Sequence, residues 1–189
     1  MREAICIKDL SFSYDKEKPV LNTVNLDILE GDKWAVIGPN GSGKSTLIKL
    51  ILGLMKPDAG SVTVFGGPPS KMSPVFGYVP QRLGDSGGRS TSVFEFVLTG
   101  LSTSKSSIGF FSKNEKKATQ ELLNEMGLGK LGEKRVSELS GGYLQKVQIA
   151  RALISKPRIL VLDEALSNLD PRKENDLFDL LEKIRPDLT

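Results

Sequence analysis

Gly38-Pro39-Asn40-Gly41-Ser42-Gly43-Lys44-Ser45-Thr46 stands between a short apolar run, Trp34 to Ile37, and a segment with helical periodicity. The three glycines let the backbone curl so that successive N–H groups point inward, and a helix that follows adds the positive end of its dipole. A glycine-rich loop between a strand and a helix is typical of sites that hold phosphate groups. We therefore predict a site for ATP or GTP.

Two side chains of this loop carry the expected chemistry. Lys44 supplies a mobile positive charge for the β- and γ-phosphates, and Ser45 offers a hydroxyl ligand to Mg²⁺. The alternative is a glycine-rich turn with an ordinary lysine, and the loop alone does not exclude it.

Composition sets few limits on function. The 189 residues suffice for one sizeable core, so we expect a single domain with subdomains. Lys and Arg number 26 against 23 Asp and Glu, a net charge of +3 that gives no reason to expect nucleic acid. Cys6 is the only cysteine, so no internal disulfide forms, and its apolar neighbours predict a buried strand position. No apolar run approaches the roughly 20 residues that cross a bilayer, so we expect a cytosolic chain.

The apolar pattern predicts alternating strands and helices. An antiparallel pair is expected at Ala4–Asp9 and Leu21–Leu29, followed by a buried strand at Lys33–Ile37 and a helix at Ser45–Met55. A second strand pair is expected at Ser61–Phe65 and Gly77–Val79.

Residues 82–138 differ in character and are predicted to be a helical insertion. Its helix, Glu115 to Met126, has a capping-box start at Ser112 and a glycine stop at Gly127. A continuous apolar strand at Arg158–Leu162 and a last helix from Asp170-Pro171 follow.

Asp163 and Glu164 stand at the end of that apolar strand. In an open α/β sheet this edge binds ligands, so the Asp163 carboxylate can reach, through water, a Mg²⁺ ion held by Ser45. Glu164 is the candidate general base for an attacking water. The alternative is that the pair only solvates a strand end.

A second phosphate-binding pattern lies at Leu139-Ser140-Gly141-Gly142-Tyr143-Leu144-Gln145 and opens another helix. Ser140 is expected to cap that helix, and its hydroxyl, the N–H groups of Gly141 and Gly142 and the helix dipole can bind phosphate. The alternative is a structural cap and a tight turn. The chain thus carries two phosphate cradles and one loop lysine.

With these motifs in this order, the chain resembles the ATP-binding cassette (ABC) family of ATPases over nearly its whole length. Six motifs carry the resemblance. Tyr14 matches the aromatic residue that stacks on adenine, residues 38–46 match the phosphate loop, and Gln81 matches the glutamine that senses metal and water. Residues 139–145 match the signature, Asp163-Glu164 match the metal ligand and base, and Ser167-Asn168-Leu169-Asp170 match the loop at the dimer interface. The implied fold is a P-loop α/β domain over residues 1–189, with a mainly parallel core sheet and an N-terminal antiparallel β subdomain. The insertion at 82–138 contains the Q-loop and the helical subdomain and leads to the signature at 139–145.

The resemblance implies a mechanism and partners. Two copies pair head to tail, so that each ATP, with Mg²⁺, lies between the phosphate loop of one subunit and the signature of the other. Gln81 and the insertion then meet an integral membrane permease at the inner face of the cell membrane. The stretches Gly77–Gln81, Ser92–Leu101 and Gly109–Phe111 look like those of ATPases that serve zinc, manganese or iron importers.

The chain departs from the family pattern in one major way. The family places a histidine that contacts the γ-phosphate on a strand after the last helix, and this sequence contains no histidine. We therefore expect a chain truncated at its C-terminus that binds nucleotide but hydrolyses it weakly. Two other functions stay open: a soluble ABC protein of translation or DNA repair, and a nucleotide-gated binding module without hydrolysis.

Overall fold

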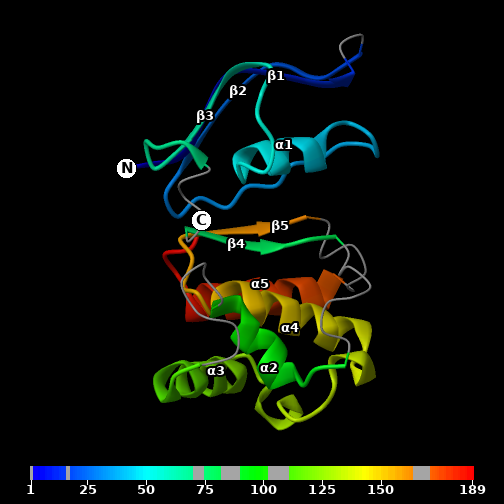
Figure 1. Cartoon of the computed structure of the whole chain (residues 1–189), viewed down its shortest axis with the longest axis vertical. Helices are drawn as coiled ribbons and strands as arrows, with labels where there is room; N and C mark the ends of the chain where they lie inside the picture. Colours follow the sequence, from blue (N-terminus) through cyan, green and yellow to red (C-terminus); the bar gives the residue numbers. More distant parts are fainter. Residues whose placement is uncertain (1, 16–17, 70–74, 82–89, 102–110, 164–170) are drawn as a thin grey trace. The chain divides into compact units, whose positions relative to one another are not determined.

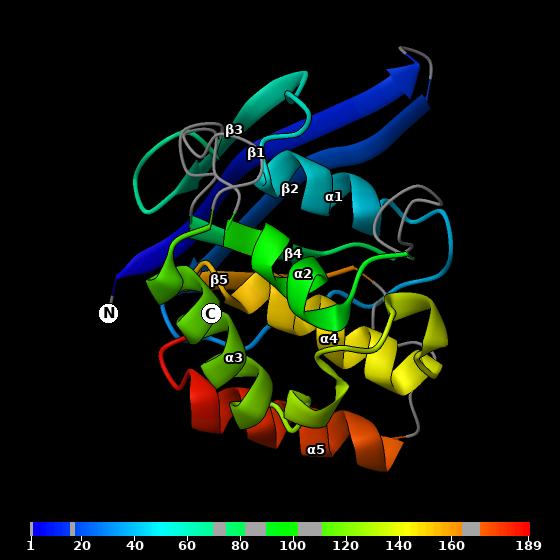
Figure 2. The ribbon, with the colours of Figure 1, turned by 60° about the horizontal axis from the view of Figure 1, so that its bottom comes forward.

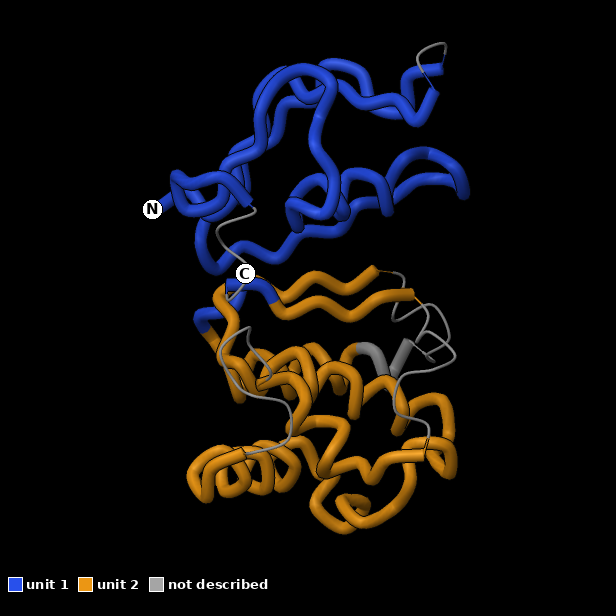
Figure 3. Tube along the Cα trace, viewed as in Figure 1, with its two compact units in different colours: residues 1–76, 187–189 blue, residues 77–186 orange. Residues whose placement is uncertain are grey.

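The computed structural model describes residues 2–15, 18–69, 75–81, 90–101, 111–163 and 171–189, with the side chains of 171–174 left out. The chain divides into two compact units (Figure 3). Unit 1 comprises residues 1–76 and 187–189, and unit 2 comprises residues 77–186. Each unit contains its own small sheet. The single domain expected over residues 1–189 stays a prediction.

Unit 1 is built on a three-stranded antiparallel sheet in the order β2-β1-β3 (Figure 1). The central strand β1 (Glu3–Asp15) pairs with β2 (Lys18–Leu29) and with β3 (Ala59–Val64). Ile5 lies opposite Ile28 on one side and Val64 on the other, so apolar side chains line one face. The predicted N-terminal antiparallel sheet is therefore confirmed, and Cys6 is buried in β1 as expected.

Helix α1 (Lys44–Ile51) covers this sheet through Leu47, Leu50 and Ile51, which are all buried. It ends four residues before the predicted Met55. The reason is local: Gly53 adopts a φ of 69°, a left-handed conformation that ends a helix.

The buried strand predicted at Lys33–Ile37 is wrong. Residues 32–39 belong to no strand, and Trp34, Val36 and Ile37 expose 55%, 48% and 93% of their surface. An apolar run becomes a strand only when neighbouring backbones accept its hydrogen bonds. In the described part of unit 1, the three strands of the sheet pair with one another and none pairs with this run.

Where the structure describes it, unit 2 combines a short strand pair with four α-helices. Strands β4 (Phe76–Val79) and β5 (Ile159–Leu162) are hydrogen-bonded neighbours, and Figure 1 draws their arrows in the same direction. The helices lie on one side of this pair (Figures 1 and 2). They are α2 (Val93–Leu98), α3 (Lys113–Glu125), α4 (Gly141–Leu153) and α5 (Pro171–Ile184).

The predicted pairing of Ser61–Phe65 with Gly77–Val79 is also wrong, because β3 pairs with β1 and β4 pairs with β5. Gly77 allows β4 to lie close to the end of α4. A Cβ atom there would stand 2.7 Å from the Ala152 carbonyl oxygen and 2.9 Å from Pro157 Cγ. Only glycine fits without a shift, and β4 then delivers Tyr78 and Val79 to the end of β5.

The start and end predicted for helix α3 are confirmed. Ser112 Oγ accepts from the Glu115 N–H at 3.2 Å, Glu115 Oε2 accepts from the Ser112 N–H, and Gly127 has a φ of 70°. Helix α2 was not predicted, although Ser92 and Glu95 form the same capping box. The described residues of unit 2 also form three short 3₁₀ turns: Thr99–Leu101, Gly129–Leu131 and Val136–Glu138.

Candidate functional site

The phosphate loop of unit 1 is closed by its own lysine. Lys44 Nζ donates to the carbonyl oxygens of Gly38 and Pro39 at 2.8 and 3.0 Å. The Ser42 N–H donates to the Pro39 carbonyl at 3.2 Å and forms a turn inside the loop. The ammonium group therefore lies over the loop in which a phosphate is expected to bind.

Glycine is required at two points of this loop. Gly41 and Gly43 have φ values of 82° and 94°, which side-chain-bearing residues rarely adopt. Gly43 is also the N-cap of α1, and a Cβ atom there would stand 3.1 Å from the side chains of Val20 and Leu21. The loop glycines are thus needed for conformation and, at Gly43, for packing against β2.

Unit 1 also brings the predicted adenine-stacking residue to the start of α1. The Tyr14 hydroxyl lies 3.2 Å from Thr46 Oγ1, while the ring meets Phe12 edge-on at a centroid distance of 5.1 Å. Thr46 is buried, but Tyr14 exposes 63% of its surface. A fixed and exposed aromatic ring beside the phosphate loop is suited to stack on a base.

The signature residues of unit 2 begin helix α4. Ser140 is the N-cap residue, as predicted, with an extended backbone at φ −65° and ψ 157°. Its side chain makes no capping hydrogen bond, unlike the capping serines of α2 and α3. Gly141 is exposed with no atom within 4 Å of an added Cβ. The first turn of a 13-residue helix thus presents backbone donors without a side-chain cap, which favours an anion.

Asp163 follows β5 and is held against β4. Its N–H donates to the Val79 carbonyl at 3.0 Å, and the Tyr78 hydroxyl donates to Asp163 Oδ2 at 3.3 Å. The side chain is 5% exposed. Burial, with the nearby Asp163 carboxylate, raises the pKa of Tyr78, so this hydroxyl stays protonated as a donor. Gln81 is exposed just beyond β4, so Gln81 and Asp163 follow the two paired strands.

Part of the predicted site lies outside the described residues. This applies to Glu164, the candidate base, and to the interface loop Ser167–Asp170. Within the described ranges no group of three or more His, Cys, Asp or Glu side chains could hold a metal ion. The residues predicted to bind Mg²⁺ offer different groups: the hydroxyl of Ser45, the side-chain amide of Gln81 and the buried carboxylate of Asp163. These donors fit Mg²⁺, which prefers oxygen and commonly uses one or two carboxylates together with phosphates and water.

Sequence reasoning missed Tyr78 as a site residue. The strand pattern around Gly77–Val79 was recognised, but nothing in the sequence indicated that β4 and β5 are paired. Only that pairing brings the Tyr78 hydroxyl to Asp163.

Comparison with known proteins places these observations in a family. The family model for ABC transporters matches residues 21–167. A zinc transport system ATP-binding protein, TroB of Treponema pallidum, is 40% identical over 185 residues, which are 96% of this chain and 68% of that protein. The zinc import ATP-binding protein ZnuC of Vibrio vulnificus is 39% identical, over 98% of this chain and 64% of that protein. The chain thus spans about two thirds of the length of these two relatives.

Solved structures agree with the sequence relatives. The ADP conformation of MJ1267, an ATP-binding cassette of an ABC transporter, matches with a TM-score of 0.84 and 28% identity, over 100% of this chain and 80% of that one. The chain therefore belongs to the ABC transporter family, whose ATP-binding subunits hydrolyse ATP to energise a membrane transporter. The fold is the P-loop α/β fold of these ATPase domains, as predicted. Among the described residues, no helix has the length and apolar character to span a bilayer.

Proposed function

We propose that this chain is the ATP-binding and ATP-hydrolysing subunit of an importer for metal ions, with zinc as the leading candidate. The observation that carries the proposal is the loop at 38–46, bridged by Lys44, in a chain that is 40% identical to a zinc transport ATP-binding protein. A second zinc import protein at 39% identity supports the same cargo.

Each chain is expected to contribute residues to two nucleotides. Tyr14 stacks on the base, Lys44 and the loop N–H groups of residues 38–46 bind the phosphates, and Ser140, Gly141 and Gly142 bind the γ-phosphate of a second copy's ATP. Preorganised donors of this kind stabilise the charge that develops during phosphoryl transfer.

Hydrolysis requires a base and a positioned water. Glu164 accepts the proton of the attacking water, and Gln81 orients that water. Ser45, Gln81 and Asp163 would hold Mg²⁺, which would offset the negative charge of the β- and γ-phosphates.

These proposed residue roles imply two kinds of partner: a second copy of the chain and a membrane permease. Two copies sandwich two ATP molecules, and loss of the γ-phosphate removes the charge that Ser140 and the α4 dipole bind, so that the dimer opens. The dimer binds an integral membrane permease through Gln81 and residues 82–138, and the chain therefore works at the inner face of the cell membrane.

The test uses Glu164→Gln, which retains nucleotide binding but lacks the base. Size-exclusion chromatography with MgATP is expected to give a dimer, and without nucleotide a monomer. The double variant Lys44→Ala/Glu164→Gln serves as the control and stays monomeric. A Glu164→Gln variant that is monomeric at saturating MgATP would contradict the proposed mechanism.

A further inference from the structure

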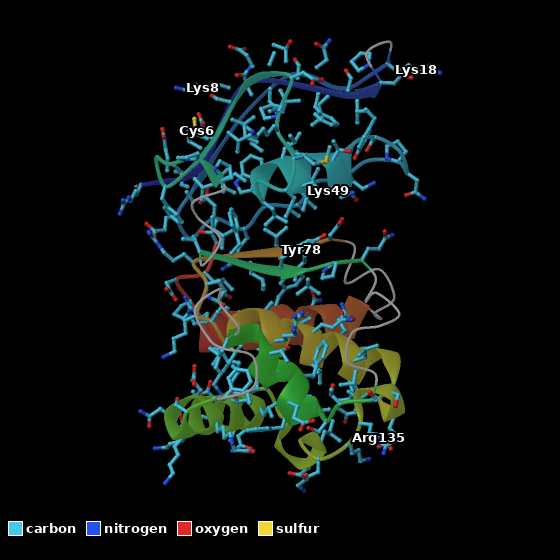
Figure 4. The ribbon with its side chains drawn as sticks, viewed as in Figure 1. Cys6, Lys8, Lys18, Lys49, Tyr78 and Arg135 are labelled. Atoms are coloured by element: carbon cyan, nitrogen blue, oxygen red, sulfur yellow. The ribbon has the colours of Figure 1, made fainter. Side chains whose placement is uncertain are left out.

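Two hydrogen bonds tie Asp163 to strand β4. One joins the backbones, from the Asp163 N–H to the Val79 carbonyl, and the other joins the side chains, from the Tyr78 hydroxyl to Asp163 Oδ2. Both donors and both acceptors belong to unit 2. Figure 4 marks Tyr78 at this strand pair.

The side-chain bond has a consequence for the orientation of the carboxylate. The terminal torsion of an aspartate is broad, so burial alone leaves the plane of its two oxygens poorly defined. A hydroxyl that donates to one oxygen fixes that plane. Partners of this kind, one shell outside a metal ion, orient the ligands and raise the affinity for the ion.

The strand that supplies the hydroxyl also leads to Gln81. Tyr78 stands three residues before Gln81. Strand β4 therefore contacts Asp163 and is followed by Gln81, and both of these residues are proposed to hold the ion. The same stretch of chain therefore supplies Gln81 and the hydroxyl that binds Asp163.

We propose that Tyr78 is a positioning residue for magnesium, in which the bond from its hydroxyl to Asp163 Oδ2 sets the carboxylate for the metal ion of MgATP. This inference rests on the proposed function, in which Asp163 holds that ion. Tyr78 itself touches neither the ion nor the nucleotide.

The competing explanation is that the hydroxyl only offsets the cost of burying Asp163. A buried carboxylate that loses one of its donors is destabilised, so Tyr78→Phe is expected to lower the thermal stability of the free protein under both explanations. The two explanations differ in the effect on metal binding. Only a positioning role changes the gain in ATP affinity that Mg²⁺ provides.

The experiment measures the dissociation constant of a fluorescent ATP analogue in EDTA and in saturating Mg²⁺, without hydrolysis as a readout. The ratio of the two constants reports the coupling between metal and nucleotide. For Tyr78→Phe we expect this ratio to move toward unity by about tenfold, with the constant in EDTA unchanged. The expected change lies at the low end of the usual range because 3.3 Å is long for a hydrogen bond donated by a hydroxyl.

Two further variants make the result decisive. Thr119→Val removes a buried hydroxyl that donates to the Glu115 carbonyl in α3, and it should leave the ratio unchanged. Asp163→Asn should reduce the ratio at least as much as Tyr78→Phe. If Asp163→Asn reduces it and Tyr78→Phe does not, the positioning role is overturned while the proposed metal site stands. If neither variant changes the ratio, the assignment of Asp163 to the metal fails and the role of Tyr78 fails with it.

Discussion

The hydroxyl of Tyr14 lies 3.2 Å from the hydroxyl of Thr46, which joins the end of strand β1 to the first turn of helix α1. Thr46 is buried and belongs to the phosphate loop, whereas most of Tyr14 is exposed. This contact fixes the ring of Tyr14 relative to the loop. It also lets the ring and the hydroxyl be tested separately.

Replacement of Tyr14 should weaken ATP binding mainly through loss of the ring. Stacking of an aromatic side chain on a base contributes about 1–3 kcal/mol, so Tyr14→Ala is expected to raise the dissociation constant by about 5- to 150-fold. Tyr14→Phe keeps the ring and should cost much less. Titration with a fluorescent ATP analogue measures both constants. Equal losses in the two variants would show that the hydroxyl, and not the ring, supports binding.

Lys44→Ala should remove the stabilisation of the chain by MgATP, because the β- and γ-phosphates lose their main positive partner. A ligand at one hundred times its dissociation constant stabilises a protein by about 2.7 kcal/mol, which a thermal shift detects readily. Lys49→Ala is the matched control, since Lys49 lies in the last turn of the same helix. We expect the control to retain the full shift. A normal shift in Lys44→Ala would contradict the assignment of the loop.

The serines at the N-cap positions of α3 and α4 should respond differently to substitution by alanine. Ser112 caps α3 through its side chain, so Ser112→Ala should lower the free energy of unfolding by about 1 kcal/mol. Ser140 makes no capping bond to α4, so Ser140→Ala should change stability by less than about 0.5 kcal/mol. Its effect should instead appear as loss of the ATP-dependent dimer in the Glu164→Gln background.

Urea unfolding and size-exclusion chromatography measure these two effects. A large loss of stability in Ser140→Ala would mean that the hydroxyl serves the helix and not a ligand. An intact ATP-dependent dimer in the same variant would contradict the contact with a second copy.

The capping box of α3 should make stability depend on pH in the acidic range. Hydrogen bonds from Ser112 lower the pKa of Glu115 below its ordinary value of 4.5. A lowered pKa in the folded state means that the stabilisation is present above the ordinary value and is lost as the pH falls through the folded value. Glu115→Gln should therefore reduce the dependence of stability on pH below about pH 5.

Urea unfolding at several pH values between about 3 and 7 measures this effect. Glu121→Gln is the control, because Glu121 is an exposed carboxylate of the same helix whose described ion pair is with Lys117. An identical pH profile for Glu115→Gln and the parent would contradict the prediction.

The sequence predicted local features well where a few neighbouring residues determine them. The capping box at Ser112, the stop at Gly127 and the antiparallel pair at the N-terminus are of this kind. It also predicted α4 and β5, because long apolar periodicity and a continuous apolar run are strong signals.

Pairing between strands that are not neighbours in the chain was predicted wrongly or not at all. The run at Lys33–Ile37 has the composition of a strand, but a strand depends on neighbours that the run does not specify. For the same reason the sequence analysis predicted the wrong partner for β4 and did not predict the hydrogen bond between Tyr78 and Asp163. Pairing joins residues far apart in the chain, so propensity and periodicity contain no information about it.

Gly100 provides the last test, because it lies where the turn after α2 meets helix α4. A Cβ atom at this position would collide with the Arg151 carbonyl oxygen and would stand 2.6 Å from Ile154 Cγ2. The Arg151 side chain also joins α4 to this turn, because its Nε donates to Thr99 Oγ1 at 3.0 Å. Gly100→Ala must therefore shift the turn relative to α4, which strains this bond.

The expected cost of Gly100→Ala is about 1–3 kcal/mol of unfolding free energy, as for other overpacked sites. Gly132→Ala is the matched control, because an added Cβ atom there meets its nearest neighbours at 3.6 and 4.0 Å, which is ordinary contact. Urea unfolding followed by circular dichroism compares the two variants. Since α4 begins at the signature serine, a displaced turn should also weaken the ATP-dependent dimer in the Glu164→Gln background. Equal stability of the two alanine variants would mean that the turn yields at no cost, and the close packing of α2 on α4 would then not support the signature helix.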